Sequence, residues 1–217
     1  GTFPLGLAYV ASAVKKKLGD RIEVKLFKYP EDIEAHLEKE IPDFYFFSSY
    51  VWNQNLNLSF AKAVRKRSQH TLIVGGGPNL SLDRERRRDF LAANPFIDFF
   101  VVQEGEIPSC YMLQTYLDLD GDLAKMKTLG LPSTLALLED GTMCEGPLAP
   151  RVGMVKDISA ITCSGHSVAP EFFNDLQGLD DIPSPYLEGL MDKFFDNNLY
   201  PLIETNRGCP FACSFCQ

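Results

Sequence analysis

The chain has 217 residues, 45% of them hydrophobic and 23% charged, a composition that is ordinary for a folded globular protein. Its formal net charge of −8 argues against a nucleic-acid-binding surface, which needs clustered lysine and arginine. No apolar run is long enough to span a bilayer and no signal-peptide pattern opens the chain, so we predict a cytoplasmic protein that binds no membrane.

The first 118 residues alternate helical and strand-like patterns. Helical periodicity predicts helices over residues 5–18, 30–39, 58–67, 83–93 and 107–117. Apolar or alternating runs predict strands over residues 22–27, 44–47, 71–74 and 99–102. Apolar strands that alternate with helices indicate a parallel sheet covered on both faces. The predicted fold class is therefore α/β, with a doubly wound parallel sheet of the Rossmann or flavodoxin-like kind.

The two ends of the chain do not match complete domains. A doubly wound sheet normally opens with a strand, whereas the first element predicted here is a helix. We therefore expect the first strand of the sheet to lie upstream of Gly1. At the other end, the residues after Pro201 are too few to close a further domain, and we expect the protein to continue beyond Gln217.

Three polar or glycine-containing loops follow predicted strands, at residues 48–53, 75–79 and 103–106. Open parallel sheets bind ligands at the carboxyl ends of their strands, so we expect these loops to line one crevice. Glycines let the backbone approach a bulky ligand, serine and asparagine supply hydrogen bonds, and tryptophan offers a flat apolar face. The candidate ligand-binding residues are Ser48, Ser49, Trp52, Asn53, Gly75, Gly76, Gly77, Pro78, Glu104, Gly105 and Glu106.

Other interpretations of these loops remain open. A glycine triplet also marks a tight turn, a Glu-Gly-Glu sequence also marks an exposed turn, and a single tryptophan is common in cores. A dinucleotide site or a P-loop is disfavoured, because residues 75–80 lack the GxGxxG spacing and no Lys-Ser/Thr pair follows. Pro78 also removes a backbone donor where a phosphate would need one.

Residues 119–199 change in character. Two short apolar runs flank Asp140-Gly141, which is a hairpin turn signal. Several prolines then divide the chain into an irregular connector, before a helix predicted at residues 187–197. We interpret this region as an interdomain bridge. The predicted domains are an α/β domain at residues 1–118, the bridge at residues 119–199, and the start of a further domain at residues 200–217.

The last nine residues carry three cysteines, Cys209, Cys213 and Cys216, in a CxxxCxxC pattern after a strand predicted at residues 200–205. Thiolates this close in sequence do not pair sensibly as disulfides, and they leave a metal site one ligand short. A [4Fe–4S] cluster held by three thiolates keeps one iron open, whereas a structural zinc site wants four protein ligands. Zinc could recruit Cys163 and His166, which leaves five candidates for four places.

The cysteine spacing, with the aromatic Phe215 before the third cysteine, resembles the CxxxCxΦC signature of the radical S-adenosylmethionine (SAM) superfamily. The resemblance implies that the three cysteines hold three irons of a [4Fe–4S] cluster and that SAM chelates the fourth. It places Phe215 among the cofactor-binding residues. It also implies an external one-electron donor and a (β/α) barrel that begins at residue 200, with its cluster loop at the carboxyl end of the first strand.

The first half of the chain resembles the cobalamin-binding domain that precedes many radical SAM barrels. Residues 4–9 look like its opening helix, residues 76–78 like its mid-sheet glycine turn, and residues 104–106 like its acidic turn. The Asp-x-His-x-x-Gly loop, whose histidine binds cobalt in some cobalamin proteins, is absent. Any cobalamin is therefore expected to bind without His36, His70 or His166 as a ligand.

These resemblances imply the N-terminal part of a cobalamin-binding radical SAM enzyme that acts on a small molecule. Radical methyl transfer is the favoured chemistry, with cobalamin carrying the methyl group. Two alternatives stay open at this point. One is a cobalamin-independent radical SAM oxidoreductase, and the other is a small-ligand-binding module with a zinc site. Metal content and the sequence after Gln217 distinguish them.

Overall fold

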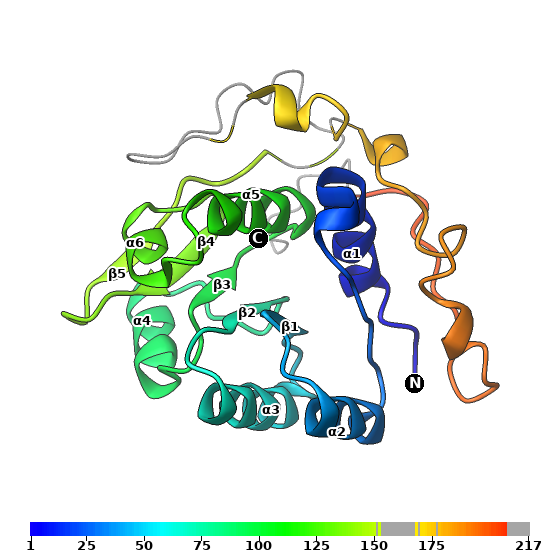
Figure 1. The fold of residues 1–217 in the computed structure, drawn as a ribbon, viewed down its shortest axis with the longest axis horizontal. Helices are drawn as coiled ribbons and strands as arrows, with labels where there is room; N and C mark the ends of the chain where they lie inside the picture. Colours follow the sequence, from blue (N-terminus) through cyan, green and yellow to red (C-terminus); the bar gives the residue numbers. More distant parts are fainter. Residues whose placement is uncertain (151, 153–167, 169, 177, 208–217) are drawn as a thin grey trace, which may run out of the picture.

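The computed structural model describes residues 1–150, 152, 168, 170–176 and 178–207. They contain a five-stranded sheet with helices packed against it (Figure 1). The strands are β1 (Phe44–Ser48), β2 (Leu72–Gly76), β3 (Phe99–Val101), β4 (Thr134–Leu137) and β5 (Met143–Glu145). They lie side by side in the order of the sequence. The first three strands are parallel, and β4 and β5 are antiparallel to their neighbours. The predicted α/β class is therefore confirmed.

Six α-helices occur in the described part of the chain. They are α1 (Leu5–Leu18), α2 (Pro30–Lys39), α3 (Gln54–Arg67), α4 (Arg84–Ala93), α5 (Glu106–Asp118) and α6 (Leu123–Thr128). The first five coincide with the predicted helices to within a few residues. Four 3₁₀ turns follow as η1 (Gly19–Arg21), η2 (Pro170–Phe173), η3 (Leu179–Asp181) and η4 (Asp192–Phe194). None of the described helices is both long and apolar enough to cross a bilayer.

The sheet is covered on both faces, as its apolar strands predict. Successive residues of β2 point to opposite faces. Leu72 and Val74 belong to a core cluster shared with α1 and α5, whereas Ile73 belongs to a second cluster shared with α2, α3 and α4. Figure 1 shows the same division, with α1 and α5 on one side of the sheet and α2 and α3 on the other.

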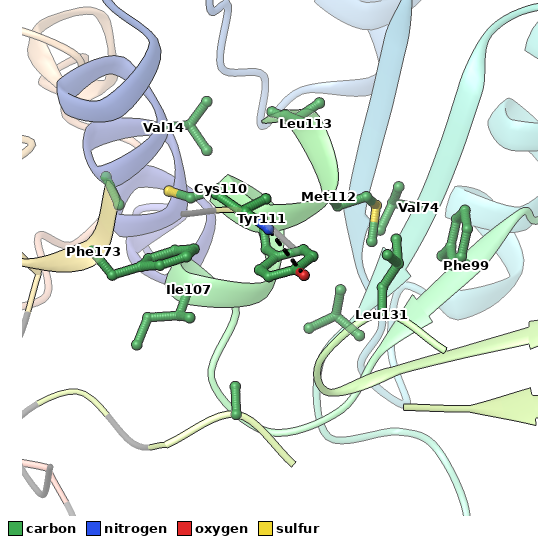
Figure 2. Close-up of a cluster of buried hydrophobic side chains, with 14 of the residues drawn as sticks. Val14, Val74, Phe99, Ile107, Cys110, Tyr111, Met112, Leu113, Leu131 and Phe173 are labelled. Atoms are coloured by element: carbon green, nitrogen blue, oxygen red, sulfur yellow. Dashed lines mark hydrogen bonds between the residues drawn. The ribbon is translucent and has the colours of Figure 1, made fainter. Parts of the chain in front are cut away.

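Tyr111 of α5 lies at the centre of the larger core cluster (Figure 2). Its ring stacks on Phe173 at a centroid distance of 6.0 Å, and its hydroxyl accepts a hydrogen bond from the Val168 N–H at 3.2 Å. The bridge is thus packed onto the α/β domain at α5. The neighbouring Cys110 is fully buried and unpaired, and burial raises the pKa of its thiol, so it acts as a small apolar side chain.

Asp98 organises the amino-terminal edge of the sheet. It immediately precedes β3, is 4% exposed, and accepts a hydrogen bond from the Ile73 N–H at 2.8 Å. Lys127 contacts the same carboxylate at 2.9 Å, and Arg65 forms a second ion pair with it. Two cations therefore compensate one buried carboxylate, which satisfies the general requirement for a buried charge.

The strand predicted at residues 22–27 is wrong. The alternation is present, because Leu26 is buried with Phe3 and Ala8 while Glu23 and Lys25 face outward. However, these residues form no ladder with the sheet, and the segment runs apart from β1 between α1 and α2 (Figure 1). In a flavodoxin-like sheet the strand order is 2-1-3-4-5, so the second strand in sequence lies at the edge of the sheet and pairs only with the first. The described residues contain no strand that could be that partner.

The predicted hairpin around Asp140-Gly141 is confirmed as β4 and β5. Leu137 is paired with Met143, and Gly141 takes a φ of +79° in the turn between them. The hairpin does more than bridge two regions, because β4 pairs with β3 in an antiparallel manner. It therefore extends the sheet of the preceding α/β domain, and Leu135 is fully buried in the cluster that α3 and α4 share.

Two predictions near the end of the described chain are also wrong. Residues 187–197 form turns and the short η4 instead of an α-helix, because Gly189 and Asn197 take φ values of +72° and +66° that a right-handed helix excludes. Residues 200–205 form only an isolated parallel bridge between Thr2 and Tyr200. A barrel strand needs neighbours along its length, and the described residues supply one at this single point.

Candidate functional site

The parallel register brings the ends of the first three strands to one edge of the sheet, here called the carboxyl edge. Ser48 at the end of β1 is opposite Gly76 at the end of β2. A Cβ added to Gly76 would lie 3.8 Å from Val101, the last residue of β3. The loops at residues 48–53, 75–79 and 103–106 therefore begin at the same edge, as the sequence pattern requires.

The first two loops are locked together through their backbones. The Ser49 N–H donates to the Gly76 carbonyl at 2.6 Å, and the Asn79 N–H donates to the Ser49 carbonyl at 3.2 Å. Gly77 has a φ of +101°, and a Cβ there would lie only 2.7 Å from the Ser49 carbonyl oxygen. Only glycine fits this position without strain.

The three glycines have different surroundings. A Cβ on Gly75 would approach the rings of Phe100 and Phe47 to within 2.7 and 2.9 Å. Packing inside the sheet therefore accounts for Gly75, and the close loop contact accounts for Gly77. Gly76 alone has ordinary van der Waals space around an added Cβ. Gly77 and Pro78 are exposed at the carboxyl edge, where a ligand can reach their backbone.

Ser48 and Asn53 shape the first loop. The Asn53 side chain accepts a hydrogen bond from the Tyr50 N–H at 2.7 Å and donates to the Ser48 carbonyl at 3.0 Å. Asn57 also donates to the Ser48 carbonyl, at 2.7 Å. Sequence reasoning missed Asn57, although its place one turn after Asn53 on α3 is a signal for a shared acceptor. Asn53 thus fixes the loop that presents Trp52.

Trp52 is 79% exposed and Val51 is 82% exposed. The Trp52 ring stacks on Tyr50, with a centroid distance of 4.8 Å and an interplanar angle of 12°. The pair forms a flat apolar platform at the carboxyl edge. Next to it, Ser49 is fully buried, and its Oγ has no hydrogen-bond partner within the described part of the chain. An exposed aromatic face beside an unused polar group suits a broad ligand that carries hydrogen-bonding side groups.

The third loop holds the acidic turn, residues 104–106. Gln103 enters it with a φ of +65°. A Cβ on Gly105 would lie 2.8 Å from a methyl group of Val10, so this glycine allows the turn to pack on α1. Glu106 starts α5, is 3% exposed, and has its carboxylate at a helix N-terminus, where negative charge is stabilised. Glu104 accepts a hydrogen bond from the Val152 N–H at 2.9 Å.

The acidic turn contacts Arg207, a residue that the sequence patterns do not single out. Arg207 Nη2 lies 2.5 Å from Glu106 Oε1, and Nη1 lies 3.5 Å from Glu104 Oε2. Nε and Nη2 each bond the Glu204 carboxylate at 3.0 Å. Burial lowers the pKa of Arg207, but the hydrogen bonds to Glu204 and Glu106 outweigh this, and the guanidinium pKa is raised above its ordinary value. The cation is therefore permanently charged.

A pocket of about 450 Å³ opens beside this ion-pair cluster. It is bounded by Tyr9 of α1, by the bridge at residues 179–187 and by residues 204–207. Its polar groups include Asp180, Glu204 and Arg207, and its apolar wall comes from the bridge. The pocket lies against the segment that leads into the cysteines.

The remaining predicted site residues are only partly placed. Cys209, Cys213, Phe215 and Cys216 lie outside the described residues, as do Cys163 and His166. Two histidines are described, and neither lies at the carboxyl edge. His36 sits near the end of α2, packs on the Phe27 ring and lies 3.9 Å from Glu40. His70 precedes β2 at the amino-terminal edge.

Comparison with known proteins agrees with this geometry. The model of the B12-binding domain family matches residues 2–110, so the chain belongs to the B12-binding domain family. The match contains β1, β2, β3 and all three loops of the carboxyl edge. The predicted relationship to cobalamin-binding domains is therefore confirmed.

Three curated relatives extend the comparison. The cobalamin-dependent radical SAM methyltransferase TokK of Streptomyces tokunonensis is 31% identical over 81% of this chain and 22% of its own length. The 2-(S-pantetheinyl)-carbapenam-3-carboxylate methyltransferase of Streptantibioticus cattleyicolor is 29% identical over 81% of this chain and 22% of its own length. The uncharacterized methyltransferase PH0819 of Pyrococcus horikoshii is 27% identical over 99% of this chain and 40% of its own length. The chain thus spans about a fifth of the first two relatives.

Proposed function

We propose that this chain is the N-terminal part of a cobalamin-dependent radical SAM enzyme that transfers a methyl group to a small molecule. The observation that carries the proposal is the order of two features in one chain: a B12-binding domain at residues 2–110 and the CxxxCxxC triad at residues 209–216. The methyltransferase names of the three relatives support the choice of methyl transfer.

The carboxyl edge is the proposed cobalamin site. The platform of Trp52 and Tyr50 provides an apolar surface for the broad corrin ring, and Ser49 with the backbone of residues 76–78 provides hydrogen-bonding groups. Glu104, Gly105 and Glu106 form the adjoining wall. His36 and His70 lie away from this edge, which supports cobalamin binding without a protein imidazole.

The triad is the proposed metal site. Three thiolates suit an iron–sulfur cluster with one iron open to a further ligand, and Phe215 is expected to lie beside it. When bound, the cluster and SAM would supply a one-electron reductive cleavage, and cobalamin would supply a methyl carrier. The proposed partners are an external one-electron donor and a small-molecule substrate. The net charge of −8 supports the absence of a nucleic-acid partner.

The proposal is tested by anaerobic reconstitution of the protein in its full natural length with iron, sulfide and hydroxocobalamin. We expect about four irons and one cobalamin per chain, the amounts that one [4Fe–4S] cluster and one B12-binding domain require. With SAM and a strong reductant, this protein should form 5′-deoxyadenosine. A cluster without cobalamin uptake would favour the radical SAM oxidoreductase, and stoichiometric zinc without iron would favour the binding module.

A further inference from the structure

Arg207 joins two parts of the chain that lie far apart in sequence. It is separated from Glu106 by 101 residues, and it follows Glu204 by three. Its side chain is 13% exposed and that of Glu106 is 4% exposed, so their contact is shielded from water. Shielding strengthens an ion pair and reduces its screening by salt. The ion pair therefore holds the segment before the cysteines against the B12-binding domain.

We propose that Arg207 is a positioning residue that holds the entry to the cysteine triad at a set distance from the carboxyl edge. The proposal rests on the proposed function, because it assumes that the triad binds a cluster and the edge binds cobalamin. The acidic turn follows β3 at the carboxyl edge, and Arg207 is two residues before Cys209. One side chain thus connects the two proposed cofactor sites.

Covalent geometry shows how far this restraint reaches. Two residues span at most about 7 Å, because each residue adds at most about 3.6 Å to an extended chain. An arginine held against the acidic turn therefore places this contact only two residues of chain before the first cysteine of the triad.

The acidic turn is a rigid anchor for this purpose. Glu106 is the first residue of α5, which packs beside α1 on one face of the sheet. Gly105 packs on Val10, and Glu104 is held by the Val152 N–H. Arg207 also lies over the Tyr9 ring, 5.4 Å from its centroid. The guanidinium is thus oriented by an aromatic ring and by carboxylates on several sides.

Lysine cannot reproduce this geometry. The planar guanidinium donates in fixed directions to Glu204 and Glu106 at once, whereas an ammonium group is a single compact charge on a flexible stem. Arg207→Lys therefore keeps the charge among the three carboxylates and removes the fixed directions. It separates a positioning role from simple charge compensation.

Arg65 provides a matched control. Its side chain is 15% exposed and pairs with Asp98, which is 5% exposed, so the burial resembles that of Arg207 and Glu106. It lies at the amino-terminal edge of the sheet, on the far side from the carboxyl edge. Arg65→Lys should thus lower stability to a similar degree without moving either proposed cofactor site.

The test uses the full-length protein reconstituted with cluster and cobalamin and reduced to cob(II)alamin and the paramagnetic cluster. Electron paramagnetic resonance then measures how strongly the cluster accelerates the spin relaxation of cob(II)alamin, an effect that falls steeply with the distance between them. In Arg207→Lys we expect a weaker and more dispersed enhancement at wild-type cobalamin content. If Arg207→Lys loses the cluster but retains cobalamin, this outcome also supports a positioning role for Arg207. Arg65→Lys should match the wild type.

Two outcomes would overturn the inference. If Arg207→Lys and Arg65→Lys both keep the wild-type enhancement, Arg207 has no positioning role, while the proposed function stands. If the wild-type protein takes up no iron–sulfur cluster, the proposed function and this inference fail together. Should Arg207→Lys not fold, Glu204→Gln replaces it, because the amide keeps the size of the side chain and removes the charge of the carboxylate that accepts two hydrogen bonds from Arg207.

Discussion

Replacing Cys213 by alanine is expected to remove the iron–sulfur cluster from the full-length protein. Iron should fall from about four per chain to a background amount, because two thiolates cannot hold a cluster that normally needs at least three. The formation of 5′-deoxyadenosine from SAM should disappear with it. Cobalamin content should stay at the wild-type level, because the B12-binding domain ends before the triad. Iron analysis, visible absorption and product analysis measure the three effects.

Cys144→Ala is the matched control for this prediction. Cys144 is a free, half-buried cysteine of β5, so its replacement removes one thiol without touching the triad. The control should keep its iron and its SAM cleavage. If Cys213→Ala retains a full cluster, or if the wild-type protein contains one zinc and no iron, the iron–sulfur interpretation of the triad is wrong.

Replacing Gly77 by alanine should destabilise the carboxyl edge. Alanine would have to keep a φ of +101° with its Cβ 2.7 Å from the Ser49 carbonyl oxygen, or else displace the loop. We expect the free energy of unfolding to fall by about 1–3 kcal/mol, the range for a residue forced into a sparsely populated backbone region. Chemical denaturation of the 217-residue chain, followed by circular dichroism, gives this difference. Equilibrium dialysis with hydroxocobalamin should also show weaker binding.

Gly76→Ala distinguishes this strain from a general effect of losing a glycine. The added Cβ at residue 76 meets its nearest atom at 3.8 Å, and the backbone there is not in the left-handed region. Its unfolding free energy should stay close to that of the wild type. Equal stability of Gly77→Ala and Gly76→Ala would contradict the structural role given to Gly77.

Much of the fold follows from local patterns in the sequence. The periods of apolar residues predict α1 to α5 and the three parallel strands, and Asp140-Gly141 predicts the hairpin. Which strands pair with one another is harder to predict from the sequence. Residues 22–27 alternate like a strand, but alternation records only which side is buried, and no described strand lies beside them. The helix predicted at residues 187–197 fails because Gly189 adopts a left-handed conformation, which its apolar neighbours do not reveal.

The site was predictable in outline and not in its roles. The position of three loops after parallel strands placed them at one edge, because parallel strands share the direction of their carboxyl ends. The sequence does not show that Gly75 makes room for two phenylalanine rings or that Asn53 is engaged by its own loop. Nor does it reveal Arg207 against Glu106, because a contact across 101 residues leaves no local pattern. Such contacts depend on the tertiary fold alone.

The most direct test of the account is the electron paramagnetic resonance spectrum of cob(II)alamin bound to the full-length protein. We predict stoichiometric cobalamin whose spectrum lacks axial nitrogen splitting, because His36 and His70 lie away from the carboxyl edge and no Asp-x-His-x-x-Gly loop is present. The spectrum should be unchanged when His36, His70 and His166 are each replaced by alanine. A nitrogen splitting that disappears in one of these variants would contradict the proposed mode of binding, and a protein that takes up no cobalamin would contradict the account as a whole.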